Sequence, residues 1–302
     1  WHAHEMLWGF IATIALAFLM TAGANWTGIN PMSGKLLALA CVLWAVARIG
    51  FLLPWETAFW VAMTAELAFF LLGSSAMLRA VVVSNNSRNY AVPGLLAGLG
   101  AMDALYLLSA RGGDYLLLMQ RFNAGLVVMA LIALLIGRRV IPFFAMRAVH
   151  ELSLPKQTET GWVQLGACAV GVLGLLLGQP MPTAFGLGLA GVLAIVHIVS
   201  WKPWAVRSNA LLWILYVGYT GVGIGLMIAA WAQVGATLPR ALPVHTIAMA
   251  GFSVMIIGMV TRTALGHTGR PLATDRTMRT SYWLMLIAVA LRLAAIANTP
   301  AT

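Results

Sequence analysis

The sequence predicts an all-α polytopic membrane protein, a transmembrane bundle of about ten helices. Hydrophobic residues make up 61% of its 302 residues and charged residues only 9%, whereas a soluble domain has about 25% charged residues. Apolar runs of roughly 20 residues, the length that spans the ~30 Å hydrocarbon core of a bilayer, recur along the whole chain. Lys and Arg are concentrated in alternate links between these runs. We therefore expect one transmembrane helical domain over residues 1–302 and no soluble domain.

The expected spans are separated by links rich in Pro, Gly and Asn. In order, the spans are Glu5–Ala22, Leu36–Leu53, Glu56–Leu78, Ala91–Leu108, Tyr115–Gly137, Trp162–Leu177, Pro182–Ser200, Leu211–Ala232, Pro243–Thr263 and Ser281–Ala297. No basic region or cleavage site precedes Trp1, so a signal peptide is not expected. We expect instead that the chain begins inside a longer gene product. Cys41 and Cys168 fall within apolar runs and are expected to be inert core residues.

The distribution of positive charge predicts the orientation of the bundle. Odd-numbered links hold 13 basic residues: Lys35, Arg79, Arg88, Arg138, Arg139, Arg147, Lys156, Lys202, Arg207, Arg262, Arg270, Arg276 and Arg279. Even-numbered links hold only Arg111 and Arg240. Cytoplasmic loops are the ones enriched in Lys and Arg, so the odd links are predicted to be cytoplasmic and residue 1 to lie at the outer face. The formal net charge of +10 is thus interpreted as a topology signal, and no nucleic-acid partner is expected.

Histidines are the first candidates for a cofactor site. His2, His4 and His245 open the first and ninth spans at the predicted outer face, whereas His197 and His267 form a looser inner pair. Imidazole suits copper, iron and zinc, and helix-borne histidines hold haem in bundles. His2 and His4 lie about 200° apart on a regular helix, so either the turn is distorted or each serves a different centre. The alternative is that these histidines are interfacial anchors with solvated tips.

Charged residues inside the spans are the second indication of a site. They are Glu5, Arg48, Glu66, Asp103, Arg121 and Arg292. Such residues are costly in a bilayer, usually face the bundle interior and mark pathways or ligand sites. Asp103 and Arg121, on neighbouring spans at similar depth, are interpreted as an ion pair or as part of a site. Arg48 and Arg121 near the outer histidines are alternatively candidates for binding haem propionates.

Glycine-containing motifs have two interpretations each. The segments NWTG (Asn25–Gly28) and GHTGRP (Gly266–Pro271) are predicted at the inner face. The second is either a ligand site around His267 or a helix C-cap with a basic end. The pairs Gly94/Gly98 and Gly221/Gly225 have the small-xxx-small spacing that permits close helix packing.

Several motifs together resemble the NnrS family. They are WHAHEMLWGF at the start, NWTG followed by a Pro and SGK, RRVIPFF after the fifth span, and MVTRTALGHTGRPL after the ninth. The resemblance covers essentially the whole chain in order. It implies a bacterial inner-membrane protein of about twelve spans, with one further helix before Trp1 and one after Thr302. It also implies bound haem and copper and a role in the response to nitric oxide.

The resemblance also assigns residues. Family histidines match His2, His4, His245 and His267, so these are the expected haem or metal ligands. Tyr106 and Tyr216 stand where family members often have histidine, a departure that bears most on copper.

The expected function is therefore that of an integral membrane protein with haem b, and copper as the second cofactor that the resemblance implies, that binds or reduces nitric oxide and protects against nitrosative stress. Glu66 is a candidate proton relay or a structural carboxyl, and the electron donor is unknown. Protons are expected from the outer side, because the inner halves of the spans offer few polar groups, among them Cys41, Gln164 and His197. The alternative is a non-enzymatic proton-coupled transporter or nitric oxide sensor. The absence of HExxH and GxSxG motifs disfavours a hydrolase.

Overall fold

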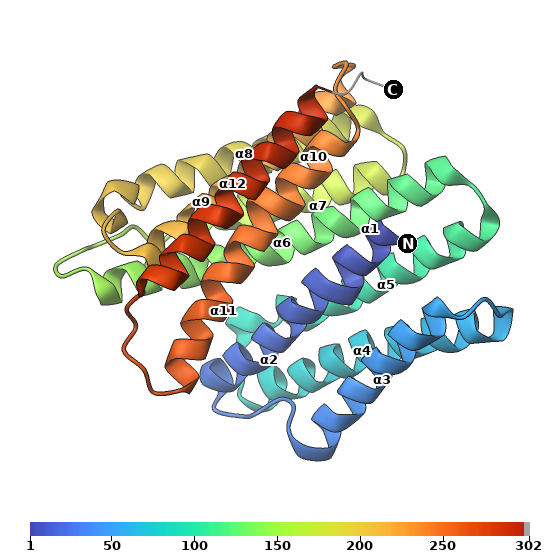
Figure 1. Ribbon diagram of the computed structural model, residues 1–302, viewed down its shortest axis with the longest axis horizontal. Helices are drawn as coiled ribbons and strands as arrows, with labels where there is room; N and C mark the ends of the chain where they lie inside the picture. Colours follow the sequence, from blue (N-terminus) through green and yellow to red (C-terminus); the bar gives the residue numbers. More distant parts are fainter. Residues whose placement is uncertain (299–302) are drawn as a thin grey trace. The chain divides into compact units, whose positions relative to one another are not determined.

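The computed structural model describes residues 1–298, and these residues form helices joined by short links, with no strand among them (Figure 1). Ten helical segments are long and apolar enough to cross a membrane. The prediction of an all-α, multi-pass membrane protein is therefore confirmed. The elements are α1 (His2–His4), η1 (Glu5–Ala12), α2 (Thr13–Thr27), α3 (Gly34–Leu52), α4 (Glu56–Val83), η2 (Ser87–Asn89), α5 (Ala91–Gly112), α6 (Tyr115–Ala148), α7 (Glu159–Leu176), α8 (Pro180–Ser200), η3 (Pro203–Val206), α9 (Ala210–Gln233), α10 (Ala241–His245), η4 (Thr246–Ser253), α11 (Val254–His267) and α12 (Arg276–Ala297).

The chain divides into two compact units, Trp1–Met129 and Ala130–Thr302. The first unit contains α1 to α5 and the beginning of α6, and the second contains the rest of α6 and α7 to α12. A single domain over residues 1–302 stays a prediction.

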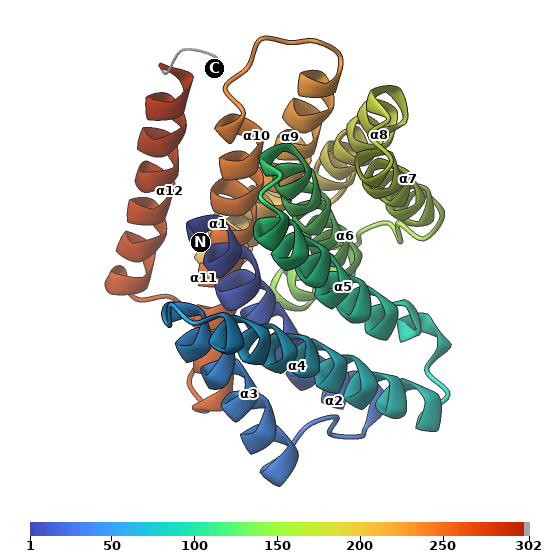
Figure 2. The same cartoon turned by 90° about the vertical axis from the view of Figure 1, so that its right-hand side faces the viewer.

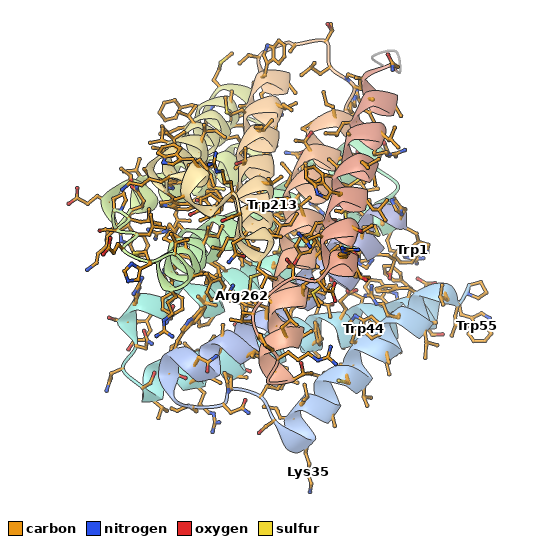
Figure 3. All side chains as sticks on the ribbon, turned by 60° about the vertical axis from the view of Figure 1, so that its left-hand side comes forward. Trp1, Lys35, Trp44, Trp55, Trp213 and Arg262 are labelled. Atoms are coloured by element: carbon orange, nitrogen blue, oxygen red, sulfur yellow. The ribbon has the colours of Figure 1, made fainter. Side chains whose placement is uncertain are left out.

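In the first unit, α3 and α4 form a helical hairpin, and α4 packs in turn against α5 (Figure 1). Figure 3 shows Lys35 at the start of α3, Trp44 along this helix and Trp55 in the link that follows it. Lys and Trp at the two ends of an apolar helix are typical of the two membrane interfaces. The core is centred on Trp8, which is fully buried and donates its indole N–H to the carbonyl oxygen of Leu99 over 3.1 Å. The first span is thereby anchored on α5.

In the second unit, α7, α8 and α9 pack side by side in sequence order (Figure 2). Glycines allow the close approach of α8 and α9, because a Cβ on Gly191 would lie 2.6 Å from the carbonyl oxygen of Gly223. Trp201, in the link after α8, and Tyr219 on α9 are fully buried. The unit therefore has its own aromatic core.

The prediction of close packing holds for one of the two glycine pairs. A Cβ on Gly221 would overlap the backbone of Ala250, and one on Gly225 would lie 2.8 Å from the amide nitrogen of Ile247. Close packing of α9 on η4 therefore requires both glycines. The prediction is wrong for Gly94 and Gly98, where an added Cβ would meet no described atom within 4 Å. This face of α5 has no close partner at that level within the first unit.

Two spans begin with a histidine followed directly by a π-helix. His4 precedes the π-helical segment η1, and His245 precedes η4. A π-helix has i→i+5 hydrogen bonds and is found frequently at functional sites. The turn that contains His2 and His4 is itself α-helical, so the two histidines face different ways, with His4 fully buried and His2 exposed.

The fifth span is longer than expected. α6 continues beyond Gly137 through Arg138, Arg139 and Pro142 to Ala148, so the predicted link begins later and RRVIPFF lies on a helix. Arg138 is buried there, donating to the carbonyl oxygen of Gln157 over 2.9 Å with its guanidinium over the Trp162 ring. These contacts hold in the interior a cation that the sequence analysis placed in a cytoplasmic link.

The two glycine motifs on the predicted inner face end helices. α2 ends at Thr27 and is capped by Gly28 with φ of 71°, the left-handed conformation that glycine adopts without strain. α11 ends at His267, and Gly269 with φ of 66° lets the amide of Arg270 donate to the carbonyl oxygen of Leu265. This is the C-capping pattern of a Schellman turn. The C-cap interpretation of GHTGRP is confirmed.

Candidate metal centre

His4 is the centre of a buried polar cluster in the first unit. Its Nε2 lies 2.9 Å from Oδ1 of Asp103 on α5 and 3.4 Å from Oε2 of Glu66 on α4. Its Nδ1 lies 3.1 Å from Oε1 of Glu5, the next residue in the chain. The side chains of His4, Asp103 and Glu66 are at most 3% exposed. The cluster therefore joins the first, third and fourth spans in the interior.

Arg48 on α3 binds two of these carboxylates. Its Nη1 donates to Oε2 of Glu5 over 2.7 Å, and its Nη2 donates to Oε1 of Glu66. Gly9 makes room for the guanidinium, because a Cβ at this position would overlap Nη1 of Arg48 and lie 2.9 Å from Oε2 of Glu5. The glycine in WHAHEMLWGF is therefore needed for Arg48 to reach the carboxylates of the cluster.

Aromatic side chains enclose the imidazole of His4. The ring centroids of Trp1, Trp8 and Phe51 lie 5.3, 5.5 and 5.1 Å from that of His4, and Tyr106 stacks on it at 5.6 Å with an interplanar angle of 21°. Tyr106 is one of the two positions where a histidine was expected from the family resemblance, and it borders the cluster directly. The aromatic enclosure excludes water and increases the cost of unbalanced charge inside it.

The cluster has the composition and spacing of a metal-binding group. One ligand atom each from His4, Glu66 and Asp103 can be chosen so that all lie within 4.8 Å of one another, which suits ligands at about 2.0–2.2 Å from a common ion. Oε2 of Glu66 and Oδ2 of Asp103 are buried and make no hydrogen bond. Of the three carboxyl groups here, Glu5 and Glu66 pair with the guanidinium of Arg48, and Asp103 pairs with the imidazole of His4. Buried negative charge in excess is costly, and a cation or bound protons would balance it.

The structure brings together some of the residues expected at a site. His4, Glu66 and Arg48 belong to one cluster. His2, two residues before His4, is exposed. The cofactor and proton-relay roles assigned to these residues stay predictions.

Asp103 and Arg121 do not form the ion pair considered from the sequence, and that interpretation is wrong. Arg121 donates to the carbonyl oxygen of Leu105 over 2.8 Å and to the hydroxyl of Ser109 over 2.6 Å. Asp103 points instead to His4. Asp103 and Ser109, which Arg121 contacts, are on different sides of α5 because six residues correspond to about 240° of rotation.

The other two expected histidine ligands lie in the second unit. Nδ1 of His245 donates to the carbonyl oxygen of Ala241 over 2.9 Å, and Nε2 lies 3.2 Å from Nη2 of Arg292 on α12. Nε2 therefore accepts that hydrogen bond. His267 is exposed at the end of α11.

Asp103 is the cluster member whose role sequence reasoning missed. It was recognised as a charge inside a span but assigned to Arg121. The available signal was the presence of three carboxyl groups, Glu5, Glu66 and Asp103, in spans with few cations. Only the rotation of α5 about its axis decides which neighbour Asp103 contacts.

Comparison with known proteins supports the family resemblance. The family model described as NnrS protein matches residues 1–302. Searches of curated proteins and of solved structures found no match. Because the family match extends over the whole sequence and the multi-pass helical fold agrees with it, this chain belongs to the NnrS family.

Proposed function

We propose that this protein is a membrane metalloprotein that binds or reduces nitric oxide, with a divalent metal ion held by His4, Glu66 and Asp103 and haem b held through His245. Membership of the NnrS family supports the link to nitric oxide. The observation that carries the proposal is the buried donor set of one imidazole and two carboxylates within 4.8 Å of one another.

The surroundings of His4 resemble those of a metal-ligating histidine. Such a histidine commonly donates its other ring N–H to a carboxylate, which fixes the tautomer and raises the basicity of the ligand. Glu5 occupies that position at Nδ1, 3.1 Å away. Nε2 then faces Asp103 and Glu66, where a metal ion would take the place of a proton.

The donor set favours a divalent ion of borderline hardness. Imidazole and carboxylate suit iron(II), zinc, manganese or copper(II), whereas copper(I) favours thiolate and thioether ligands. Copper fits this cluster in its divalent state.

His245 fits an axial ligand of haem. Its Nδ1 donates to the carbonyl oxygen of Ala241, so Nε2 carries the lone pair that could bind iron. The present partner of Nε2 is Nη2 of Arg292. Arg292 would then be released to bind a propionate. Arg48 and Arg121, the propionate partners expected from the sequence, have other acceptors, namely Glu5 and Glu66 for the first and Leu105 and Ser109 for the second.

When bound, the metal groups would supply a coordination position for nitric oxide and a path for electrons. Reduction of two molecules of nitric oxide to nitrous oxide and water consumes two protons and two electrons. Oδ2 of Asp103 makes no hydrogen bond and is not the oxygen that faces His4, so Asp103 can hold a proton at that atom. Arg48 binds Oε1 of Glu66 and so directs Oε2 of Glu66 toward the metal ion.

The test is metal analysis and optical spectroscopy of the protein purified in lipid nanodiscs. Wild type is expected to carry about one equivalent of a transition metal and a haem Soret band, in line with the ligand set. His4→Ala and Asp103→Asn should lose the metal, and His245→Ala should lose the Soret band. His150→Ala, which changes an exposed histidine in a link, is the matched control.

Nitric oxide consumption, followed with an electrode and a chemical reductant, tests the chemistry. Loss of consumption in His4→Ala and His245→Ala, but not in His150→Ala, is expected. Wild-type protein without metal, without haem and without effect on nitric oxide would overturn the proposal.

The same cluster supports one alternative function. Two carboxylates, an imidazole and a guanidinium in a bundle interior are also the groups of a proton-coupled transporter. In that case the protein contains no metal or haem, and Asp103→Asn abolishes a proton flux in liposomes.

A further inference from the structure

A second buried polar cluster lies in the second unit, around His197 on α8. The hydroxyl oxygen of Thr160 on α7 lies 3.1 Å from Nε2 of His197. The hydroxyl oxygen of Tyr219 on α9 lies 3.4 Å from Nδ1 of the same ring. Thr160 donates to Oε1 of Gln157 over 2.9 Å, and Tyr219 donates to Oε1 of Gln164 over 3.2 Å. The five side chains form one continuous hydrogen-bonded chain.

The chain connects an exposed end to a buried end. Thr160 is exposed in the first turn of α7, beside the exposed charged residues Lys156 and Glu159. His197, Tyr219 and Gln164 are fully buried. A polar route therefore runs from the aqueous end of these spans to a closed interior.

The side-chain amides of Gln157 and Gln164, at the two ends of this hydrogen-bonded chain, can only accept hydrogen bonds from it. Nε2 of Gln164 donates to the carbonyl oxygen of Ala190 over 3.1 Å, which leaves Oε1 facing Tyr219. Nε2 of Gln157 donates over 2.6 Å to the hydroxyl of Ser200, which itself donates to the carbonyl oxygen of His197. Neither amide can be turned over without breaking these bonds.

With both ends accepting, the chain is one proton short when His197 is neutral. Its hydrogen bonds are Gln157–Thr160, Thr160–His197, His197–Tyr219 and Tyr219–Gln164. The two hydroxyls and a neutral imidazole supply one proton each, so one of these bonds always lacks a proton. Protonation of His197 completes all of them, with both ring nitrogens donating.

The positive charge of Arg138 destabilises the protonated form of His197. The helices α7 and α9, which with α8 form this part of the unit, carry Glu159 and Cys168, and Tyr216 and Tyr219, respectively, and α6 contributes Arg138. The buried guanidinium of Arg138 interacts electrostatically with His197. Because like charges repel in a medium of low dielectric constant, an added proton passes on instead of staying.

We propose that His197 is a proton-loading site that takes up a proton from water through Thr160 and holds it transiently in the interior of the second unit. A hydronium ion in the adjoining water gives a proton to the hydroxyl oxygen of Thr160, and the proton that this hydroxyl already carries turns from Gln157 and passes to Nε2 of His197, leaving neutral water and an imidazolium. The imidazolium then donates from Nδ1 to Tyr219 until a proton returns to water by the same route. This function needs no bound cofactor and stands apart from the metal centre.

The test is the exchange of the ring N–H protons of His197 with deuterium. Solid-state NMR of protein in lipid bilayers, labelled with ¹⁵N-histidine, follows these protons after transfer to D₂O, and His197→Gln identifies the signals. In wild type, the ring protons are expected to exchange well before the backbone amide of Leu215, which lies in the buried core of α9. A purely structural network would exchange only when the helices open.

The decisive variant is Thr160→Val, which removes the hydroxyl at the exposed end and keeps the shape of the side chain. It should slow exchange at His197 by roughly tenfold, because opening of the helices then becomes the remaining route. Tyr216→Phe is the matched control, since its hydroxyl donates to the carbonyl oxygen of Trp201 outside the chain. Exchange in wild type as slow as at Leu215, or unchanged in Thr160→Val, would overturn the proposal.

Discussion

The contribution of a single charged residue to the stability of this protein depends on whether its charge is buried and balanced by a partner. Arg48 is the cation that neutralises part of the negative charge of Glu5 and Glu66, and its side chain is only 13% exposed. Arg111 makes a similar pair with Glu56, but there the side chains are 43% and 64% exposed. The chemical groups are the same in both pairs, and their different burial determines how much each pair contributes to the free energy of unfolding.

This contrast predicts the effect of removing each arginine. Arg48→Met should destabilise the purified protein by about 3–5 kcal/mol, the usual cost of leaving a buried charge without its partner. Arg111→Met should cost about 0–1 kcal/mol, as for other exposed ion pairs. The apparent melting temperatures in detergent, measured without added metal, give the comparison. Equal shifts for the two variants would mean that the Glu5–Arg48–Glu66 cluster is solvated.

At the scale of elements, the π-helix η1 determines which side chains of the first span reach the interior. It begins directly after His4 and returns to α-helical structure at Thr13. A π-helical turn contains one extra residue compared with an α-helix, and each residue rotates an α-helix by about 100°. The segment before η1 is therefore rotated relative to α2, and this rotation leaves His4 buried against Asp103.

Deletion of Phe10, an exposed residue of η1, should restore α-helical register and turn His4 out of the cluster. Modification of histidines with diethyl pyrocarbonate, followed by mass spectrometry, measures the change. In wild type, His4 should be protected and the exposed His2 modified, so His2 serves as an internal reference. In the deletion variant, both should be modified, whereas Phe10→Ala should keep the wild-type pattern. Protection of His4 in the deletion variant would show that η1 does not set its orientation.

For the whole molecule, the asymmetry of positive charge predicts the orientation in the membrane. The links with 13 basic residues should face the cytoplasm, and those with Arg111 and Arg240 should face outward. Cysteines introduced in a Cys41→Ser background, in which the remaining Cys168 is fully buried, report this directly. An impermeant thiol reagent added to intact cells should label Thr237→Cys, beside Arg240, and not His267→Cys. The reverse pattern would invert the predicted topology.

The sequence alone determined the fold class and the number of spans, because hydrocarbon thickness imposes length and composition on every spanning segment. All ten expected spans correspond to candidate membrane-spanning helices. It also identified His4, Glu66, Arg48 and Asp103 as unusual, since charge and imidazole inside apolar runs are visible in one dimension. Their mutual contacts were not predictable, because they depend on the rotation of each helix about its axis.

Tertiary structure alone paired Asp103 with His4 instead of Arg121. It joined Gln164 to His197 through Tyr219 and placed Thr160 at the other ring nitrogen of His197. It also decided that Gly221 and not Gly98 lies at a close helix contact. The physical reason is the same in each case. Most residues of these spans are apolar on all sides, so hydrophobic periodicity does not show which face is internal. That face is fixed by the packing of neighbouring helices and by where each buried polar group finds its partner.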